Sequence, residues 1–265
     1  MAERTALKIE NVSKTFASAG RGEEVLSEVN LTISEGEFAI LLGPSGCGKS
    51  TLLKIIAGFI PPTRGRVVLA NNREVTGPGR DRGMVFQSLG TSLFPWLNVY
   101  ENIEFGLRMA RIAVNRRKEI VNRYIKKVGL RGHEKKYPVE LSGGMQQRVQ
   151  IARVLANNPD ILLMDEPFAA LDAQTRKIMQ RELTTIWEDE KKTVVFVTHD
   201  IREAISMGQK VAVMTAGPGA KIKKLYTVTL AYPRDEASSD FIELWRQIER
   251  DIEEEVEKLI SQQML

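Results

Sequence analysis

A glycine-rich stretch of the sequence combines the residue types that bind phosphate. GPSGCGKS, residues 43–50, has the pattern Gly-x-x-x-x-Gly-Lys-Ser between an apolar run and a helical pattern. Glycines let the backbone bend so that successive N–H groups converge on phosphate oxygens, and a helix N-terminus behind them adds partial positive charge. We expect Lys49 to reach the β- and γ-phosphates of a nucleotide and the Ser50 hydroxyl to face Mg²⁺.

A pair of acids follows a second apolar run, ILLMDEP, residues 161–167. An apolar strand of this kind delivers Asp165 at its end, where a carboxylate can hold Mg²⁺ directly or through water. Glu166 can then face the water opposite the γ-phosphate as a general base or an orienting group. An Asp-Glu pair in a loop is otherwise only a surface feature. Together the two motifs predict a hydrolase of ATP or GTP.

ELSGGMQQRVQIARVL, residues 140–155, contains a second phosphate-binding pattern. Ser142, Gly143 and Gly144 open an amphipathic helix, and small residues at a helix N-terminus leave backbone N–H groups free to meet an anion. The simpler interpretation is an ordinary N-capped helix, which explains the serine but not the paired glycines. The chain therefore carries two predicted phosphate-binding motifs, although only one of them is a complete nucleotide-binding motif.

Short β-branched runs predict the strands that must position these motifs. The runs are residues 7–12, 29–33, 38–42, 66–69, 83–87, 161–164, 193–198 and 210–214. A helix is predicted over 50–59, ended by Gly58 and two prolines, and helical periodicity returns from Val99. Residues 88–158 show no convincing strand, whereas strands and helices alternate on both sides of them. This pattern predicts an α/β core with an inserted helical lobe.

The end of the sequence predicts a strand or hairpin from about residue 221 and then a helix. The helix starts near Ser239 or Asp240, either of which is a suitable N-cap. Its apolar positions keep helical spacing, and the charges of ERDIEEEVEK are most simply a solvated face. We therefore divide the chain into an ATPase domain over 1–220, with the inserted helical part at about 88–158, and a C-terminal part over 221–265.

Composition narrows the environment and the partners of the chain. The net charge is +4 and Lys and Arg form no dense stripe, so nucleic acid is not demanded as a ligand. The single cysteine, Cys47, allows no disulfide within the chain and suits a reducing compartment. The N-terminal stretch has no apolar signal core, and the longest apolar runs are too short to span a bilayer. We expect a cytoplasmic protein that reaches the membrane only through a partner.

The motifs together resemble the ATP-binding cassette (ABC) family of ATPases over nearly the whole chain. GPSGCGKST resembles its Walker A motif, LLMDEP its Walker B motif and LSGGM its LSGGQ signature, while FAALD resembles the loop that links two sites. The resemblance implies an α/β fold, with a RecA-like P-loop NTPase core, an antiparallel β subdomain and an inserted α-helical subdomain. It also places Gln87 on Mg²⁺ and the attacking water, and His199 on the γ-phosphate.

The same resemblance implies a complete set of site residues, with ATP and Mg²⁺ as cofactors. Catalytic roles fall to Glu166, His199 and Gln87, and Mg²⁺ contacts to Ser50, Gln87 and Asp165. The nucleotide-binding residues are Phe16, which would stack on adenine unless it is a core residue, and Gly43, Pro44, Ser45, Gly46, Cys47, Gly48, Lys49, Ser50 and Thr51. In this family two copies pair head to tail, so Ser142, Gly143 and Gly144 would serve the partner's γ-phosphate.

Further segments resemble the nitrate/sulfonate/taurine-type importer branch of the family. LFPWLNVYENIEFGL, residues 93–107, carries that branch's Pro-Trp pair, although the spacing from Gln87 is slightly longer than the resemblance leads us to expect. The implied protein is a peripheral ATPase subunit on the cytoplasmic face of the cell membrane. Its partners would be integral permease subunits, and indirectly an extracytoplasmic solute-binding protein. The alternative is a soluble, non-transport ABC ATPase that acts on nucleic acid or the ribosome.

Overall fold

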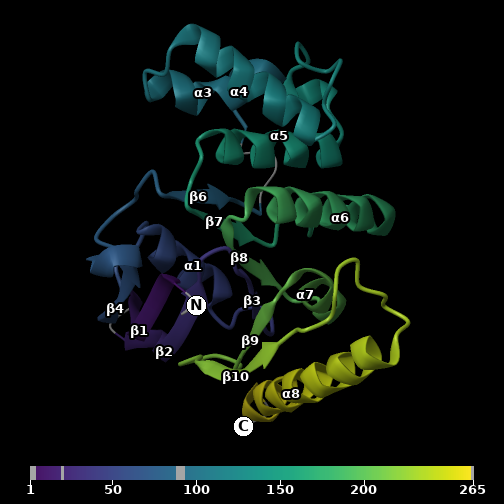
Figure 1. Ribbon diagram of the computed structural model, residues 1–265. Helices are drawn as coiled ribbons and strands as arrows, with labels where there is room; N and C mark the ends of the chain where they lie inside the picture. Colours follow the sequence, from purple (N-terminus) through teal and green to yellow (C-terminus); the bar gives the residue numbers. More distant parts are fainter. Residues whose placement is uncertain (1–3, 19–20, 88–92, 264–265) are drawn as a thin grey trace. The chain divides into compact units, whose positions relative to one another are not determined.

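The structure is a computed structural model that describes residues 4–18, 21–87 and 93–263. Its contacts divide the chain into two compact units, Met1–Gly79 with Thr193–Leu265, and Arg80–Lys192. The first unit carries the glycine-rich loop and His199. The second carries the acid pair, Gln87 and the signature stretch. Figure 1 shows the helices and strands of both units.

An antiparallel sheet forms the N-terminal part of the first unit. Its strand order is β2-β1-β4-β5, with β1 Thr5–Ser18, β2 Arg21–Ser34, β4 Arg64–Leu69 and β5 Arg73–Glu74; the short 3-10 helix η1, Ala70–Asn72, precedes β5. The strands β1 and β2 run far beyond the predicted 7–12 and 29–33, because their ends pair with each other, for example Phe16 with Glu23. This sheet confirms the expected antiparallel β part of the fold.

A mainly parallel sheet forms the rest of the first unit. The strand β3 (Phe38–Leu42) lies parallel to both β8 (Thr193–Thr198) and β9 (Lys210–Met214), and β10 (Ile222–Thr227) runs antiparallel to β9. Every residue of β3 and β8 is buried, as is usual for parallel strands that are covered on both faces. Helices α1 (Lys49–Ala57) and α7 (Ile201–Met207) pack against this sheet. The open prediction of a strand or hairpin after residue 220 is resolved as the single strand β10.

The helix α1 ends at Ala57, two residues before the predicted end, because Gly58 caps it. Gly58 adopts φ 80° and donates its N–H to the last turn of the helix. A Cβ atom built on Gly58 would lie 2.2 Å from the carbonyl oxygen of Gly77. Only glycine therefore fits this helix end, on both conformational and steric grounds.

The C-terminal helix α8, Ser239–Gln263, runs alongside β9 and β10 (Figure 1). Its N-terminal N–H groups are capped by Ser238, whose Oγ accepts from the N–H of Phe241 at 3.3 Å. The prediction that its charges form a solvated face is wrong for two acids, Asp251, whose side chain is 15% exposed, and Glu255. Glu255 is only 3% exposed, whereas the apolar Val256 beside it is 38% exposed. The reason is a lysine of β10, Lys223, whose ammonium group faces this side of the helix.

The described residues of the second unit form a parallel strand pair and the helices α3 to α6. The strands β6 (Arg82–Val85) and β7 (Ile161–Asp165) pair in parallel, and α3 (Val99–Met109), α4 (Val114–Lys127) and α5 (Gly143–Ala156) pack on one another. The helix α6, Ala173–Glu190, and the short 3-10 helix η2, Pro138–Glu140, complete it. Over the described residues 93–158 no strand occurs, in agreement with the predicted helical character. Residues 88–92, with the extra length after Gln87, lie outside the described residues.

Ion pairs and a capping box fix the helices of this unit. Asn98 accepts from the N–H of Glu101, and the Glu101 carboxylate accepts from the N–H of Asn98, both at 2.9 Å. Lys127 of α4 pairs with Glu190 of α6 at 2.7 Å, which joins these two helices. Within the described part of the chain, none of the helices is both long and apolar enough to cross a membrane.

Candidate functional site

The glycine-rich loop lies between β3 and α1, in the strand-loop-helix context that phosphate binding requires. Gly46 and Gly48 adopt φ of 80° and 93°, the left-handed region that favours glycine. A Cβ atom on Gly48 would also lie 2.8 Å from Cδ2 of Leu26, so packing and conformation both select glycine there. At Gly46 a Cβ atom would meet nothing within 4 Å, which places this part of the loop beside open space.

The lysine of the loop is buried and turned back onto the loop itself. Lys49 is 4% exposed, and its Nζ donates to the carbonyl oxygens of Gly43 and Pro44, both at 2.7 Å. Its Nζ also lies 3.9 Å from Sγ of Cys47. Burial raises the pKa of the Cys47 thiol, although the nearby lysine acts in the opposite direction. The positive charge of Lys49 therefore lies inside the loop, where it can reach a phosphate that the loop binds.

Four further residues of the predicted site lie in the same unit. Ser50 and Thr51 occupy the first turn of α1, and His199 follows β8 directly as an exposed residue. Phe16 is 40% exposed on β1, so it is not a core residue, and Nζ of Lys14 lies 5.0 Å from the centre of its ring. An exposed aromatic face of this kind is suited to stacking on a flat ligand.

The acid pair lies at the carboxyl end of β7, in the second unit. Asp165 is the last residue of the strand and 7% exposed. Glu166 adopts φ 42°, so the backbone turns immediately after the strand through a conformation that non-glycine residues rarely adopt. The Glu166 carboxylate accepts a hydrogen bond from Nε2 of Gln87 at 3.4 Å. Two residues predicted to act on one water are thus brought together from separate strands, β6 and β7.

The signature stretch forms the N-terminus of α5. Ser142 is the N-cap, and its Oγ accepts from the N–H of Met145 at 3.3 Å. Ser142 and Gly143 are exposed, whereas Gly144 is buried. A Cβ atom on Gly144 would lie 2.8 Å from Cγ2 of Thr175 in α6. The exposed start of a helix of this length presents N–H groups and the positive end of the helix dipole to an anion.

Side chains on α5 fix the orientation of this N-terminus. Arg148 donates to the carbonyl oxygen of Val128 at 2.8 Å and pairs with Glu182 of α6 at 2.9 Å. The fully buried Gln150 donates from Nε2 to the carbonyl oxygen of Phe86 at 3.2 Å. Gln150 was not among the predicted site residues, yet it connects the signature helix to the residue that precedes Gln87. The sequence feature that could have identified Gln150 is its position, because it is a polar residue on the apolar side of a predicted helix.

The predicted site residues therefore fall into two sets. The first unit holds Phe16, His199 and the loop residues Gly43 to Thr51, and the second holds Gln87, Asp165, Glu166 and the residues Ser142 to Gly144. The expected Mg²⁺ ligands, Ser50, Gln87 and Asp165, offer only oxygen donors, which suit a hard cation. Among the described residues, no three His, Cys, Asp or Glu side chains are grouped as a metal site of their own.

Comparison with known proteins identifies the family. Residues 26–169 match the model of the ABC transporter family. The chain is 52% identical over 258 residues to an uncharacterized ABC transporter ATP-binding protein of Methanocaldococcus jannaschii, covering 97% of this chain and 95% of that protein. It is 50% identical over 214 residues to the taurine import ATP-binding protein TauB of Escherichia coli O157:H7, covering 81% and 82% of the two chains.

A solved structure agrees with the sequence relatives. It is a dimeric ATP-binding cassette in a post-hydrolysis state bound to ADP and Pi, with a TM-score of 0.73 and 36% identity over 84% of this chain and 98% of that one. The P-loop, the acid pair and the signature helix described above are the parts on which the family resemblance rested. The chain belongs to the ABC transporter family, and it is an ATPase of that family.

Proposed function

We propose that this chain is the ATP-hydrolysing subunit of an ABC importer, bound to permease subunits at the cytoplasmic face of the cell membrane. The observation that carries the proposal is the exposed N-terminus of α5, a second anion-binding element apart from the P-loop. The similarity to a taurine import ATP-binding protein supports the import direction and a small solute with an anionic group, such as the sulfonate of taurine, as the cargo. A solute-binding protein outside the membrane would supply that cargo to the permease.

In this proposal the P-loop encloses the phosphates of ATP. The backbone N–H groups of residues 43–51 meet phosphate oxygens, and Lys49 exchanges its two carbonyl partners for the β- and γ-phosphates. Those carbonyls are neutral acceptors, whereas phosphate oxygens are charged and bind an ammonium group more strongly. Phe16 stacks on the adenine ring with its exposed face.

The residues of the second unit carry the hydrolytic chemistry. Asp165 and Gln87, with the Ser50 hydroxyl from the first unit, would hold Mg²⁺, which neutralises phosphate charge when it is bound. Glu166 takes the proton of the attacking water, and Gln87, which already donates to Glu166, orients that water. His199 contacts the γ-phosphate.

Two copies pair head to tail, so that the α5 N-terminus of one copy meets the ATP held by the P-loop of the other. A complementation experiment tests this arrangement. The variants Lys49→Ala and Ser142→Ala are each expected to lose most ATPase activity. A mixed dimer nevertheless contains one site with both wild-type elements if the sites are shared between copies. Activity of the mixture above the sum of the separate variants is expected, and no gain on mixing would contradict the shared site.

Residues 93–107 are the proposed docking site for the permease. Its Trp96 is 70% exposed, whereas Leu93 is buried and Phe94 packs on Phe105 with ring centroids 4.4 Å apart. The segment is thus partly core and partly surface, and the exposed tryptophan is suited to anchor a short helix of a membrane partner. Residues 88–92, which precede it, lie outside the described residues.

Purification of the tagged chain from membranes in mild detergent tests the importer assignment. A multi-spanning permease in matched stoichiometry is the expected companion, and uptake assays would then use the cargo of its binding protein. Recovery with ribosomes or nucleic acid instead would support the soluble, non-transport alternative and overturn the importer assignment.

A further inference from the structure

The loop that joins β9 to β10 lies directly against the P-loop. A Cβ atom on Gly217 of this loop would lie 3.7 Å from the carbonyl oxygen of Gly46 and 3.9 Å from Cα of Cys47. At the other end of the P-loop, a Cβ atom on Gly43 would lie 3.2 Å from the carbonyl oxygen of Met214, the last residue of β9. Met214 and Gly217 therefore both contact the P-loop, and we call the segment that contains them, residues 214–220, the wall of the P-loop.

This wall is held from one side by β2. The N–H of Gly219 donates to the carbonyl oxygen of Glu24 at 2.6 Å, and the N–H of Ala220 donates to that of Val25 at 3.0 Å. The next residue of β2, Leu26, is the one that packs against Gly48 of the P-loop. The same strand thus contacts both the wall and the loop that the wall supports.

From the other side the wall is held by the C-terminal helix. The Glu255 carboxylate of α8 accepts a hydrogen bond from the N–H of Ala216 at 3.1 Å. Glu255 is 3% exposed, so water competes little for this bond. Ala216 immediately precedes Gly217, which places the side chain of Glu255 one residue away from the P-loop contact.

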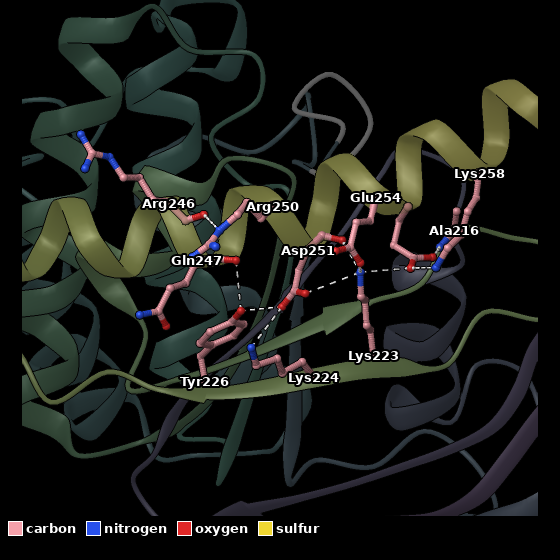
Figure 2. Close-up of polar contacts among 11 residues, drawn as sticks. Ala216, Lys223, Lys224, Tyr226, Arg246, Gln247, Arg250, Asp251, Glu254 and Lys258 are labelled. Carbon is pink, nitrogen blue, oxygen red and sulfur yellow. Dashed lines mark hydrogen bonds and ion pairs between the residues drawn. The ribbon is translucent and has the colours of Figure 1, made fainter.

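Two lysines compensate the buried charge of Glu255. Its Oε1 lies 3.2 Å from Nζ of Lys223 and 2.6 Å from Nζ of Lys258. Lys223 also donates to the carbonyl oxygen of Asp251 at 2.8 Å and to the Glu254 carboxylate at 2.7 Å (Figure 2). A buried ion is stable only when its charge and hydrogen bonds are satisfied, and this network meets that condition.

The hydroxyl of Tyr226 adds a second attachment of the helix to β10. It donates to the Asp251 carboxylate, and its oxygen also lies 3.2 Å from the carbonyl oxygen of Gln247 (Figure 2). Nζ of Lys224 lies 3.6 Å from Asp251 on the same side. The helix is therefore docked in register, with Glu255 fixed opposite Ala216.

We infer that Glu255 is a positioning residue for nucleotide binding: α8 holds the N–H of Ala216, the Ala216–Gly217 wall holds the P-loop, and the P-loop holds the phosphates. The inference rests on the proposed role of the P-loop. It extends the nucleotide site to a helix that lies outside the segment matched by the family model, residues 26–169.

The single cysteine of the chain reports on this coupling. Cys47 is 1% exposed within the P-loop, so a thiol reagent reacts with it only when the loop opens. The test compares wild type, Glu255→Ala, Glu255→Gln and the control Glu254→Ala, a neighbouring acid that pairs only with Lys223 among the described contacts and is 61% exposed. Two quantities are measured well below the melting temperature, the rate of Cys47 alkylation by iodoacetamide and the Kd for ATP.

The expected result is a graded one. Glu255→Ala removes the acceptor of a charged hydrogen bond and should raise both the alkylation rate and the Kd for ATP by about 10-fold. Glu255→Gln keeps an oxygen that can accept from Ala216 and should restore part of this loss. Glu254→Ala should stay within about 2-fold of wild type, since exposed ion pairs contribute little.

A stability control separates positioning from general weakening. Ile248→Ala removes a fully buried side chain of α8 but leaves Glu255 in place. The two variants are compared at an equal loss of melting temperature. If Ile248→Ala then raises the rate of Cys47 alkylation as much as Glu255→Ala does, Glu255 has no specific role. Wild-type-like behaviour of Glu255→Ala would also overturn the inference. The proposed role of the P-loop fails separately, if ATP does not slow the alkylation of Cys47 in the wild type.

Discussion

The side-chain amide of Gln87 donates to the Glu166 carboxylate, with Nε2 and Oε2 3.4 Å apart, although 79 positions separate them in the sequence. Gln87 follows β6, Glu166 follows β7, and the two strands pair in parallel. Parallel pairing brings the carboxyl ends of both strands to one edge, which is where ligands bind in open α/β sheets. The bond links the proposed water-orienting residue to the proposed base.

Replacing Glu166 with glutamine should separate ATP binding from hydrolysis. Glu166→Gln keeps an oxygen for Gln87 but cannot take a proton, so turnover should fall by about 10²–10⁴-fold while the Kd for ATP changes little. The variant should accumulate as an ATP-dependent dimer, measured by light scattering beside a phosphate-release assay. Glu188→Gln, an exposed acid of α6, is the control. A chain that stays monomeric with ATP would contradict the dimer model.

Gly144 offers a test of the α5 N-terminus. Gly144→Ala places a methyl group against Cγ2 of Thr175 and should shift the start of the helix at a cost of about 1–3 kcal/mol. ATP-dependent dimerisation and ATPase activity should fall, whereas ATP binding by the monomer should be retained. Thr175→Ser removes that methyl group and keeps the hydroxyl, so the double variant should recover activity. Failure of this rescue would show that the close contact is not the cause.

Phe16 should set the affinity for adenine nucleotides without affecting stability. Loss of stacking in Phe16→Ala is expected to weaken ATP binding by about 1–3 kcal/mol, whereas Phe16→Tyr keeps the ring and should bind like wild type. The melting temperature should hardly change, because the side chain is 40% exposed. Calorimetric titration with ATP measures the difference. Equal ATP affinities of the alanine and tyrosine variants would show that Phe16 does not stack on the adenine ring.

Trp96 should matter for the membrane partner and not for the isolated subunit. Trp96→Ala is expected to lose the permease in detergent purification by at least about 10-fold, the usual effect of removing an aromatic anchor. ATPase activity of the free subunit should be unchanged. Ile178→Ala, which alters another exposed apolar side chain of the same unit, is the matched control. Normal recovery of the permease with Trp96→Ala would place the docking site elsewhere.

Acid pH should loosen α8 through Asp251 and Glu255. Burial alone would raise the pKa of both, but hydrogen bonds from Tyr226 to Asp251 and from Lys258 and Ala216 to Glu255, with charge from Lys223 and Lys224, lower both pKa values overall. A carboxylate with a lowered folded pKa stabilises the protein above its unfolded pKa, and this contribution disappears as pH falls through the folded value. The stabilisation should therefore be complete above about pH 5 and decline below about pH 4.

Urea unfolding of wild type and of the double variant Asp251→Asn/Glu255→Gln measures this dependence. The difference in the free energy of unfolding between the two proteins should be largest near neutral pH and shrink towards pH 3. A difference that stays constant over this range would show that these carboxylates do not stabilise α8 by their charge.

The sequence alone determined the parts of the site that are local along the chain. A strand, a glycine loop and a helix follow one another over residues 38–57, so spacing predicts the loop and the position of Lys49 at the start of the helix. The acid pair at the end of β7 and the capped start of α5 are local in the same sense. Backbone conformation and capping depend on near neighbours, and the residue types that they require are visible in the sequence.

Only the tertiary structure decided which distant groups meet. The Gln87–Glu166 bond depends on the pairing of β6 with β7, and the Glu255–Ala216 bond on the docking of α8 against β10. Helical periodicity predicts the faces of α8, but it does not show that Lys223 of β10 lies opposite one of them. Glu255 was therefore predicted to be solvated, although it is buried. Within one apolar segment the sequence likewise could not separate the buried Leu93 from the exposed Trp96. Burial and charge pairing are properties of the packed chain, because both depend on residues far apart in sequence.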